Sequence, residues 1–262
     1  METVRSADGT TIAHDQVGHG PVLIMVGGAM TARNSGTKPQ LVDLLAAHFT
    51  VLSYDRRGRG DSGDTQPYTA GREIEDIEAL IDRAGQAACL YGHSSGGCLA
   101  LDAAVQLGPK VSKLAMYEVP YSDDPAFQQA YAQYREQLAS ALAGNRRGDA
   151  VAAFMTLIGM PAEQVEAMRQ APFWPGMEAI APTLAYDHAG VIGEDLSVPV
   201  KRAAQVDVPA LVMYGTASPP FMAETATTLS KALPRAELRA LDGQDHSVDP
   251  AVLAPVLTAF LS

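Results

Sequence analysis

Short apolar runs alternate along this chain with stretches in which apolar residues recur every three or four positions. A continuous run at residues 22–26 predicts a strand buried on both faces. Further strands are predicted at residues 3–6, 11–16, 49–54, 87–92, 111–117, 209–214 and 237–241. Helices are predicted at residues 39–48, 74–81, 222–233 and 248–261. This alternation predicts an α/β fold with a mostly parallel central sheet that helices cover on both faces.

The alternation lapses between residues 122 and 201, where helical patterns alone follow one another. We expect residues 1–121 and 202–262 to form the core, and residues 122–201 to form a helical cap inserted within the same domain. Helices are predicted in it at residues 125–142, 149–158 and 162–170. Its large apolar residues, including Met155 and Trp174, either line a pocket for an apolar substrate or pack as the core of the cap.

One serine lies at a sharp turn between a predicted strand and a predicted helix. Gly92, Ser94 and Gly96 match the G-x-S-x-G pattern, in which small flanking residues let a strained turn expose one hydroxyl. The alternative is a serine in an ordinary glycine-rich turn. In the first interpretation the Ser95 N–H, together with an N–H of Gly28 or Ala29 from the loop after residues 22–26, forms an oxyanion hole.

A serine nucleophile needs a base, and the base needs a group that orients it. Of the six histidines, His246 follows the last predicted strand. The other five lie in an edge strand, in a turn, at the end of a helix, directly before Ser94 or in the cap. The acid that orients such a histidine usually follows the strand that ends here at Tyr214, but the loop after Tyr214 holds no carboxylate. Glu118, at the end of the strand that follows the Ser94 turn, is the candidate acid in its place. The alternative interpretation is that Glu118 pairs with an arginine where the core meets the cap.

Two other charged segments are interpreted as structural. The loop at residues 55–62 lacks the GK[ST] of a phosphate-binding loop, and we expect local pairing of its Asp and Arg residues to stiffen it. In the helix at residues 74–81 and the turn before it, the acidic residues are expected to face outward; these are Glu73, Glu75, Asp76 and Glu78.

The composition narrows the class of partner. The chain has 262 residues, is 47% hydrophobic and carries a net charge of −11. It can therefore bury one large core, and its acidity argues against nucleic acid or an anionic membrane surface as a partner. A neutral or apolar small molecule fits better, and a homodimer is left open.

Sequence motifs add expectations about cofactors and location. With neither CxxC nor HExxH present, no metal or cofactor is expected, and Cys89 and Cys98 are interpreted as small buried hydrophobes rather than a disulfide. No secretory or transmembrane pattern is seen, so a cytoplasmic location is expected.

The elbow, the loop at residues 55–62 and the late His246 together resemble the α/β-hydrolase superfamily. More narrowly, residues 94–96, Glu118-Val119-Pro120, Ser218-Pro219 and residues 243–246 resemble the zearalenone lactonases. That resemblance implies a Ser94–His246–Glu118 triad that opens a lactone, with Trp174 at the substrate. Met155 of the cap and Ser218 are also expected to contact the substrate. The chain departs from that family in having Gly27-Gly28 where the family has Asp-Gly.

The resulting expectation is a serine hydrolase for a carboxylic ester or lactone of a small apolar molecule. Two alternatives stay open: a non-hydrolysing, receptor-like binder that keeps the pocket, and cofactor-free perhydrolase or lyase chemistry in the same fold. Dehalogenase chemistry is disfavoured, because it needs an Asp where Ser94 stands.

Overall fold

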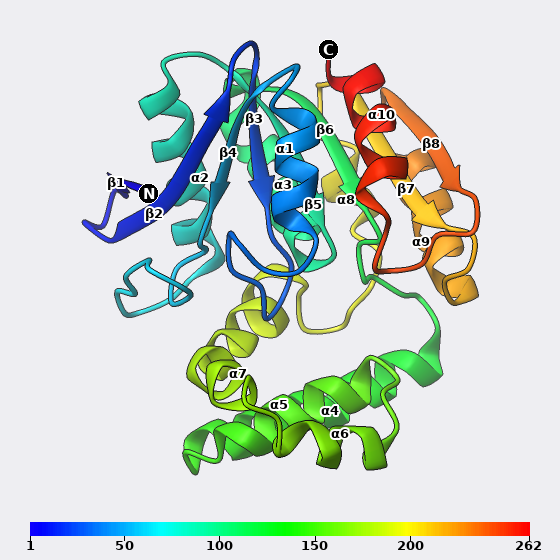
Figure 1. Ribbon diagram of the computed structural model, residues 1–262. Helices are drawn as coiled ribbons and strands as arrows, with labels where there is room; N and C mark the ends of the chain where they lie inside the picture. The colour runs from blue at the N-terminus through cyan, green and yellow to red at the C-terminus, as the bar shows by residue number, and fades with distance from the viewer.

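An eight-stranded sheet forms the centre of the computed structural model, which describes residues 1–262 apart from the side chain of Ala189 (Figure 1). Its spatial strand order is β1-β2-β4-β3-β5-β6-β7-β8. The strands are β1 (Glu2–Arg5), β2 (Thr11–Gly18), β3 (Val22–Val26), β4 (Thr50–Tyr54), β5 (Ala88–His93), β6 (Val111–Tyr117), β7 (Ala210–Gly215) and β8 (Ala236–Leu241). Strand β2 pairs antiparallel with β1 and β4, and every other neighbouring pair is parallel. The predicted mostly parallel sheet is confirmed.

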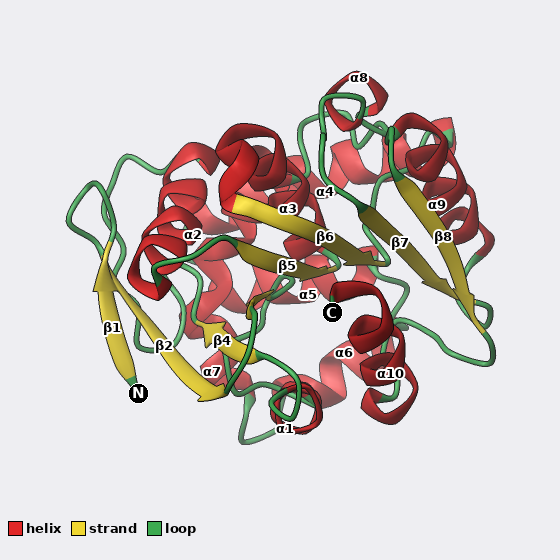
Figure 2. Cartoon of the chain, turned by 90° about the horizontal axis from the view of Figure 1, so that it is seen from above, coloured by secondary structure: helices red, strands yellow, loops and turns green.

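Helices cover both faces of this sheet, as predicted (Figure 2). One face carries α1 (Lys38–Leu45) and α10 (Pro250–Leu261); the other carries α2 (Ala70–Ala84), α3 (Ser95–Leu107) and α9 (Pro220–Ala232). Each face buries its own apolar cluster against the sheet. Among the described residues, no helix is long and apolar enough to span a membrane.

Helix α2 shows how the apolar pattern sets a buried face. Ile74, Ile77 and Leu80 are buried, and the helix ends at Gly85, whose φ of 74° is the left-handed conformation that glycine adopts most easily. The expectation that its acidic residues face outward is wrong for Glu73 and Asp76, which are both buried. Each is paired with a buried arginine, and this pairing offsets the cost of removing its charge from water.

The cap helices lie across the carboxyl ends of the parallel strands (Figure 1). They are α4 (Pro125–Ala143), α5 (Arg147–Leu157), α6 (Ala162–Arg169) and α7 (Trp174–Ile180), with a π-helical turn at Tyr186–Val191. The short α8 (Val200–Ala203) follows the cap and contacts α3 and α9 of the core. Helix α4 begins where expected, because the Asp124 side chain accepts the Phe127 N–H at 2.8 Å and Pro125 occupies the first turn. The α7 helix and the π-helical turn were not predicted, since both are short and interrupted by Pro or Gly.

The order of the strands reverses direction at one point near the centre of the sheet. After β3 the chain adds β4 on one side, and then returns to add β5 on the other side of β3. In open α/β sheets, ligands bind at such a reversal, beyond the carboxyl ends of the strands. Because Val26 of β3 pairs with Gly92 of β5, the loop after β3 and the elbow after β5 meet at this point.

Close packing at this junction leaves no room for a side chain at Gly96. A Cβ there would meet the carbonyl oxygens of Val26 and Gly27, the latter at 2.6 Å. We therefore expect Gly96→Ala to lower the free energy of unfolding by about 1–3 kcal/mol in urea denaturation. Gly176→Ala is the matched control, since a Cβ there meets nothing within 4 Å. Equal stabilities of the two variants would contradict this packing argument.

Candidate active site

Ser94 lies at the turn between β5 and α3 in a backbone conformation that non-glycine residues rarely adopt, with φ 55° and ψ −130°. The turn is tight because the backbones of its glycines pack against one another: a Cβ at Gly92 would lie 2.5 Å from the Gly96 carbonyl oxygen. The Ser94 N–H donates to the Tyr117 carbonyl oxygen at 2.9 Å, which ties the turn to the end of β6. This strained geometry agrees with the nucleophile elbow expected from the sequence.

Glu118 and His246, 128 positions apart in the chain, are in direct contact. His246 Nδ1 lies 2.8 Å from Glu118 Oε2, and the Gly215 N–H donates to Glu118 Oε1 at 2.9 Å. The Glu118 side chain is fully buried, whereas that of His246 is 47% exposed. Because an ionised carboxylate only accepts hydrogen bonds, Nδ1 carries a proton, and in the neutral form of the ring Nε2 then has the free lone pair. His246 is thereby held in the tautomer that a general base requires.

Two side chains near the elbow hold the loop that carries His246. His93 Nε2 lies 3.0 Å from the His246 carbonyl oxygen, and the Tyr117 hydroxyl donates to the Asp245 carbonyl oxygen at 2.5 Å. A carbonyl accepts only, so His93 Nε2 carries a proton and donates. Burial, reinforced by the nearby His246, lowers the pKa of His93 to about 3, so this imidazole stays neutral at neutral pH. The sequence did not single out His93 for this supporting contact.

The loop after β3 lies directly beside Ser94. A Cβ placed on Gly28 would lie 3.0 Å from Ser94 Cβ and 3.6 Å from Ser94 Oγ. Ser95 is the first residue of α3, so its N–H has no partner within the helix. Gly28, Ala29 and Ser95 are thus brought to the candidate nucleophile, as an oxyanion hole requires.

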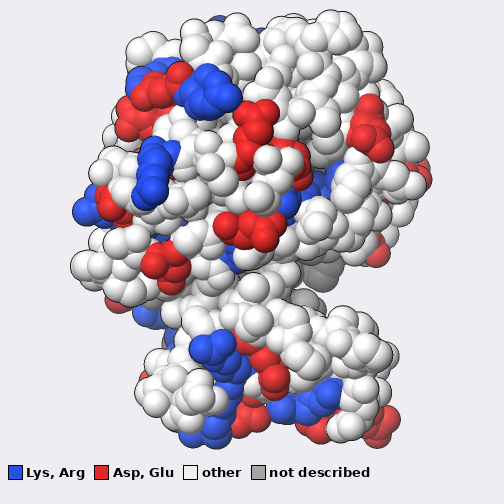
Figure 3. Space-filling model, turned by 60° about the vertical axis from the view of Figure 1, so that its left-hand side comes forward, with Lys and Arg blue, Asp and Glu red and all other residues white. Residues whose placement is uncertain are grey.

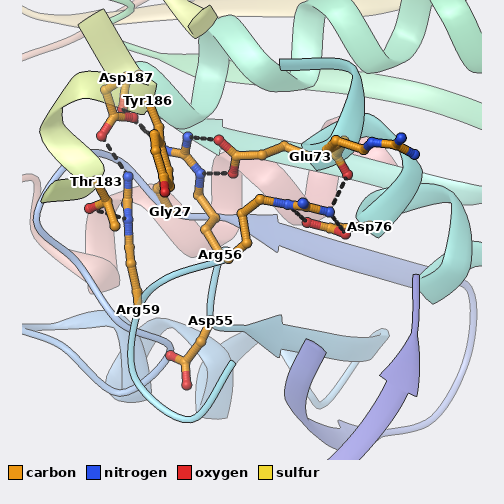
Figure 4. Close-up of polar contacts among 12 residues, drawn as sticks. Gly27, Asp55, Arg56, Arg59, Glu73, Asp76, Thr183, Tyr186 and Asp187 are labelled. Atoms are coloured by element: carbon orange, nitrogen blue, oxygen red, sulfur yellow. Dashed lines mark hydrogen bonds and ion pairs between the residues drawn. The ribbon is translucent and has the colours of Figure 1, made fainter. Parts of the chain in front are cut away.

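The loop at residues 55–62 is stiffened by ion pairs, but these are mostly not local. Its arginines pair with carboxylates far along the chain. Arg56 pairs with Glu73 and Asp187, and Arg59 with Asp187 (Figure 4). Arg57 pairs with Asp8 and Asp76. The expectation of local Asp and Arg pairing is wrong for these three arginines, because their long side chains reach across the fold to α2 and the cap. No spacing in the sequence marks Asp187 as a partner of this loop.

The three residues expected at the substrate lie in different surroundings. The Trp174 indole is 4% exposed, donates to Glu178 Oε1 at 3.0 Å and has Arg169 over its ring, so it packs within the cap. Met155 is buried in the apolar cluster that continues from the core into the cap. Ser218 lies in the loop after β7, and its Oγ is buried with no hydrogen-bond partner among the described residues. Figure 3 shows the molecule narrowing between core and cap.

His188 is a second neutral histidine and lies among aromatic rings of the cap. It is 4% exposed, its ring is 4.7 Å from that of Tyr134, and both ring nitrogens lack a partner among the described residues. Burial lowers the pKa of His188 from 6.5 to about 4.

Acid should therefore destabilise the fold through His188. Above pH 6.5 the residue is neutral whether folded or unfolded; below it, only the unfolded chain binds the proton until the pH nears 4. The free energy of unfolding should fall across this window by about 1.4 kcal/mol per pH unit from this residue alone. We expect His188→Phe to show a shallower decline in urea titrations at successive pH values. Equal slopes in the two proteins would contradict a neutral His188.

Residues 19–256 match the alpha/beta hydrolase family, and the chain belongs to that family. An alpha/beta hydrolase from Sphaerobacter thermophilus is 48% identical, with 100% of both chains covered and a TM-score of 0.86. An esterase from Exiguobacterium antarcticum is 17% identical, with 99% of this chain and 98% of its own covered, at a TM-score of 0.74; that likeness concerns the fold alone.

A curated relative, a proline iminopeptidase from Pestalotiopsis fici, is 31% identical over 99 residues. The match covers 37% of this chain and 35% of the length of that relative. The family match over residues 19–256 confirms the prediction that the chain belongs to the α/β hydrolases.

Proposed function

We propose that the protein hydrolyses carboxylic esters or lactones of small, largely apolar molecules through Ser94, His246 and Glu118. The observation that carries this proposal is the 2.8 Å contact between His246 Nδ1 and the buried Glu118 carboxylate, beside the strained turn at Ser94. A serine at an elbow becomes nucleophilic when an oriented histidine accepts its proton.

The proposed reaction has two halves. Ser94 Oγ attacks the carbonyl carbon while its proton passes to His246 Nε2, and Glu118 stabilises the imidazolium that results. When the carbonyl re-forms, the C–O bond to the alcohol breaks and that oxygen takes the proton from Nε2. Water then attacks the acyl-serine and gives a proton to His246, which returns it to Ser94 as the acid leaves. With a lactone, the alcohol and the acid remain in one molecule.

The oxyanion formed in each half is assigned to the N–H of Ser95 and to an N–H of the Gly28–Ala29 segment. Both segments adjoin Ser94, and neither Ser95 nor Ala29 donates its N–H within the hydrogen-bonded structure of the described residues. Because backbone amides are already oriented before the reaction, they stabilise developing charge without reorganisation.

The substrate class is proposed from the cap and from the resemblance in sequence. The apolar cluster that continues into the cap includes Tyr131, Tyr134 and Met155, which favours an apolar acyl or alcohol group. The resemblance of residues 94–96 and 118–120 to the zearalenone lactonases adds macrocyclic lactones to the class. In this proposal Trp174 shapes the cap from within, whereas Ser218 offers a polar group.

A substrate screen with an active-site probe tests the proposal. Turnover is measured on p-nitrophenyl esters of increasing chain length, on thioesters and on lactones including zearalenone, and a fluorophosphonate adduct is sought by intact-mass measurement. We expect ester or lactone hydrolysis and one adduct, at Ser94. A pocket that binds ligands without an adduct or turnover would favour the receptor-like alternative. Turnover only with added peroxide would favour perhydrolysis.

A further inference from the structure

A buried ion cluster joins the cap to the segments that carry the candidate oxyanion donors (Figure 4). Its centre is Asp187, from the π-helical turn of the cap, which is 0% exposed. Asp187 Oδ1 accepts hydrogen bonds from Arg56 Nη1 at 2.6 Å and from Ser95 Oγ at 2.7 Å. Asp187 Oδ2 accepts from Arg59 Nη2 at 2.5 Å. One carboxylate of the cap therefore holds two arginines of the core and the residue after Ser94.

Arg59 continues from this carboxylate to the loop after β3. Its Nη1 donates to the Gly28 carbonyl oxygen at 2.6 Å, and the Thr31 hydroxyl donates to the same oxygen at 2.8 Å. In a planar trans peptide the C=O and the following N–H point in opposite directions. Fixing the Gly28 carbonyl therefore fixes the direction of the Ala29 N–H. Of the two N–H groups considered as the second oxyanion donor, that of Ala29 is therefore the one whose direction Arg59 and Thr31 control.

The first donor is held through its own side chain. The Ser95 hydroxyl is bound by Asp187, and Arg56 Nη1 reaches both Ser95 Oγ, at 3.5 Å, and the Gly27 carbonyl oxygen, at 3.3 Å. These contacts fix the first residue of α3 against the loop after β3. Both donor segments thus depend on the same carboxylate.

The charges of the cluster make it sensitive to the loss of Asp187. Burial opposes ionisation of this carboxyl, but Arg56, Arg59 and the hydrogen bond from Ser95 outweigh it and lower the pKa of Asp187 to about 2. Without that charge, Arg56 would keep only Glu73 as a carboxylate partner, and Arg59 would keep none among the described residues. An uncompensated buried charge is costly, so the arginines would move to find water or other partners.

We propose that Asp187 is a positioning residue that aligns the Ser95 and Ala29 N–H groups when the cap is seated on the core. The inference rests on the proposed function, since it assigns a role at the same site. It makes the oxyanion hole complete only while the π-helical turn of the cap lies against α3 and the loop after β3.

Three variants test this role. Asp187→Asn removes the central charge, and Ser95→Ala removes one hydrogen bond while keeping the backbone N–H. Asp102→Asn is the matched control: Asp102 is also a buried aspartate linking α3 to the segment beyond the cap, but its partner is Arg202, with Nε 3.0 Å from Oδ1. Each is assayed for kcat and KM on p-nitrophenyl acetate, for binding of a phenylboronic acid that forms a tetrahedral adduct with Ser94, and for Tm.

We expect Asp187→Asn to lower kcat about 10²-fold or more, as loss of one oxyanion donor does, with KM within about twofold of the parent. Boronate affinity should fall in parallel. Ser95→Ala should lower kcat about tenfold, because one of several contacts is lost. Asp102→Asn should change Tm at most, and should leave kcat and boronate binding at the parent values.

Several results would overturn the proposal. The first is that Asp187→Asn, like the control, lowers only Tm. The second is that Asp187→Asn raises KM and leaves kcat unchanged. If Asp187→Asn does not fold, an unchanged kcat in Ser95→Ala overturns the proposal in its place. If the parent hydrolyses no ester but binds boronate in an Asp187-dependent way, the proposed function fails and the positioning role stands. If the parent shows neither activity nor boronate binding, both fail.

Discussion

Glu118→Gln should lower kcat on an activated ester about 10⁴-fold, as loss of the charge on a triad acid does. Both carboxylate oxygens of Glu118 accept hydrogen bonds, one from the Gly215 N–H and one from His246 Nδ1. A glutamine has only one acceptor oxygen, so one of these two donors must face an NH₂ group. If that donor is His246, the ring adopts the other tautomer and Nε2 carries a proton. It then accepts nothing from Ser94.

Glu224→Gln provides the control for that experiment. Glu224 lies exposed in α9, close in sequence to the loop after β7, where a triad acid is expected in this fold. We expect its kcat to equal that of the parent, and both variants to keep the parent circular dichroism spectrum. A Glu118→Gln variant with near-parent turnover would remove Glu118 from the mechanism and would assign the orientation of His246 to another group.

Ser94→Ala should have the larger effect, a loss of kcat of about 10⁶-fold, because the nucleophile of a serine hydrolase triad is removed outright. The elbow itself should persist, since alanine fits wherever the serine Cβ already lies. Stability should therefore change little, and the fluorophosphonate adduct should disappear from the intact mass. Alanine at a φ of 55° is as strained as serine there, so the backbone conformation gives no reason for a change in fold.

Ser112→Ala is the matched control for the nucleophile. Ser112 is exposed near the amino-terminal end of β6, at the opposite end of the sheet from the elbow. The parent adduct and turnover should remain in this variant. An adduct that persists in Ser94→Ala would place the reactive hydroxyl elsewhere, and hydrolysis that persists without an adduct would rule out the acyl-serine.

The position of the site follows from the order of strands rather than from any single motif. Ser94 follows β5 and Glu118 follows β6, two neighbouring parallel strands, so their ends meet at one edge of the sheet. His246 follows β8, two strands further along. Hydrogen bonds from His93 and Tyr117 hold its loop beside the elbow. A loop from a distant strand can therefore bring its imidazole to the buried Glu118.

The parts of the fold that sequence reasoning predicted are those that depend on local pattern. Unbroken apolar runs and helical spacing located the strands and most helices to within a few residues, because a strand or helix of this length must bury one continuous face. The candidate residues at strand ends were reached in the same way. Glu118 stands out because a carboxylate among apolar neighbours needs a partner, and His246 lies 2.8 Å from it.

Reasoning from local pattern failed where long side chains span the fold. Glu73 and Asp76 were expected on the outer face of α2, yet both are buried against arginines of the loop at residues 55–62. Helical spacing says which residues share a face, but it does not show that a charged group is paired within the protein. The Trp174 indole binds Glu178 inside the cap, and the placement of Trp174 at the substrate stays a prediction.

The class of fold, the strained turn at Ser94 and the candidate triad can be predicted from the amino-acid sequence, because each rests on periodicity or on a residue at the end of a strand. The surroundings of these residues depend instead on how the folded chain packs. Arg56 and Asp187 are 131 positions apart, and their contact arises only when the cap closes over the strand ends. Such a contact follows from how the cap and core pack, which no local spacing encodes. The ion cluster beside the candidate oxyanion donors was therefore visible only in three dimensions.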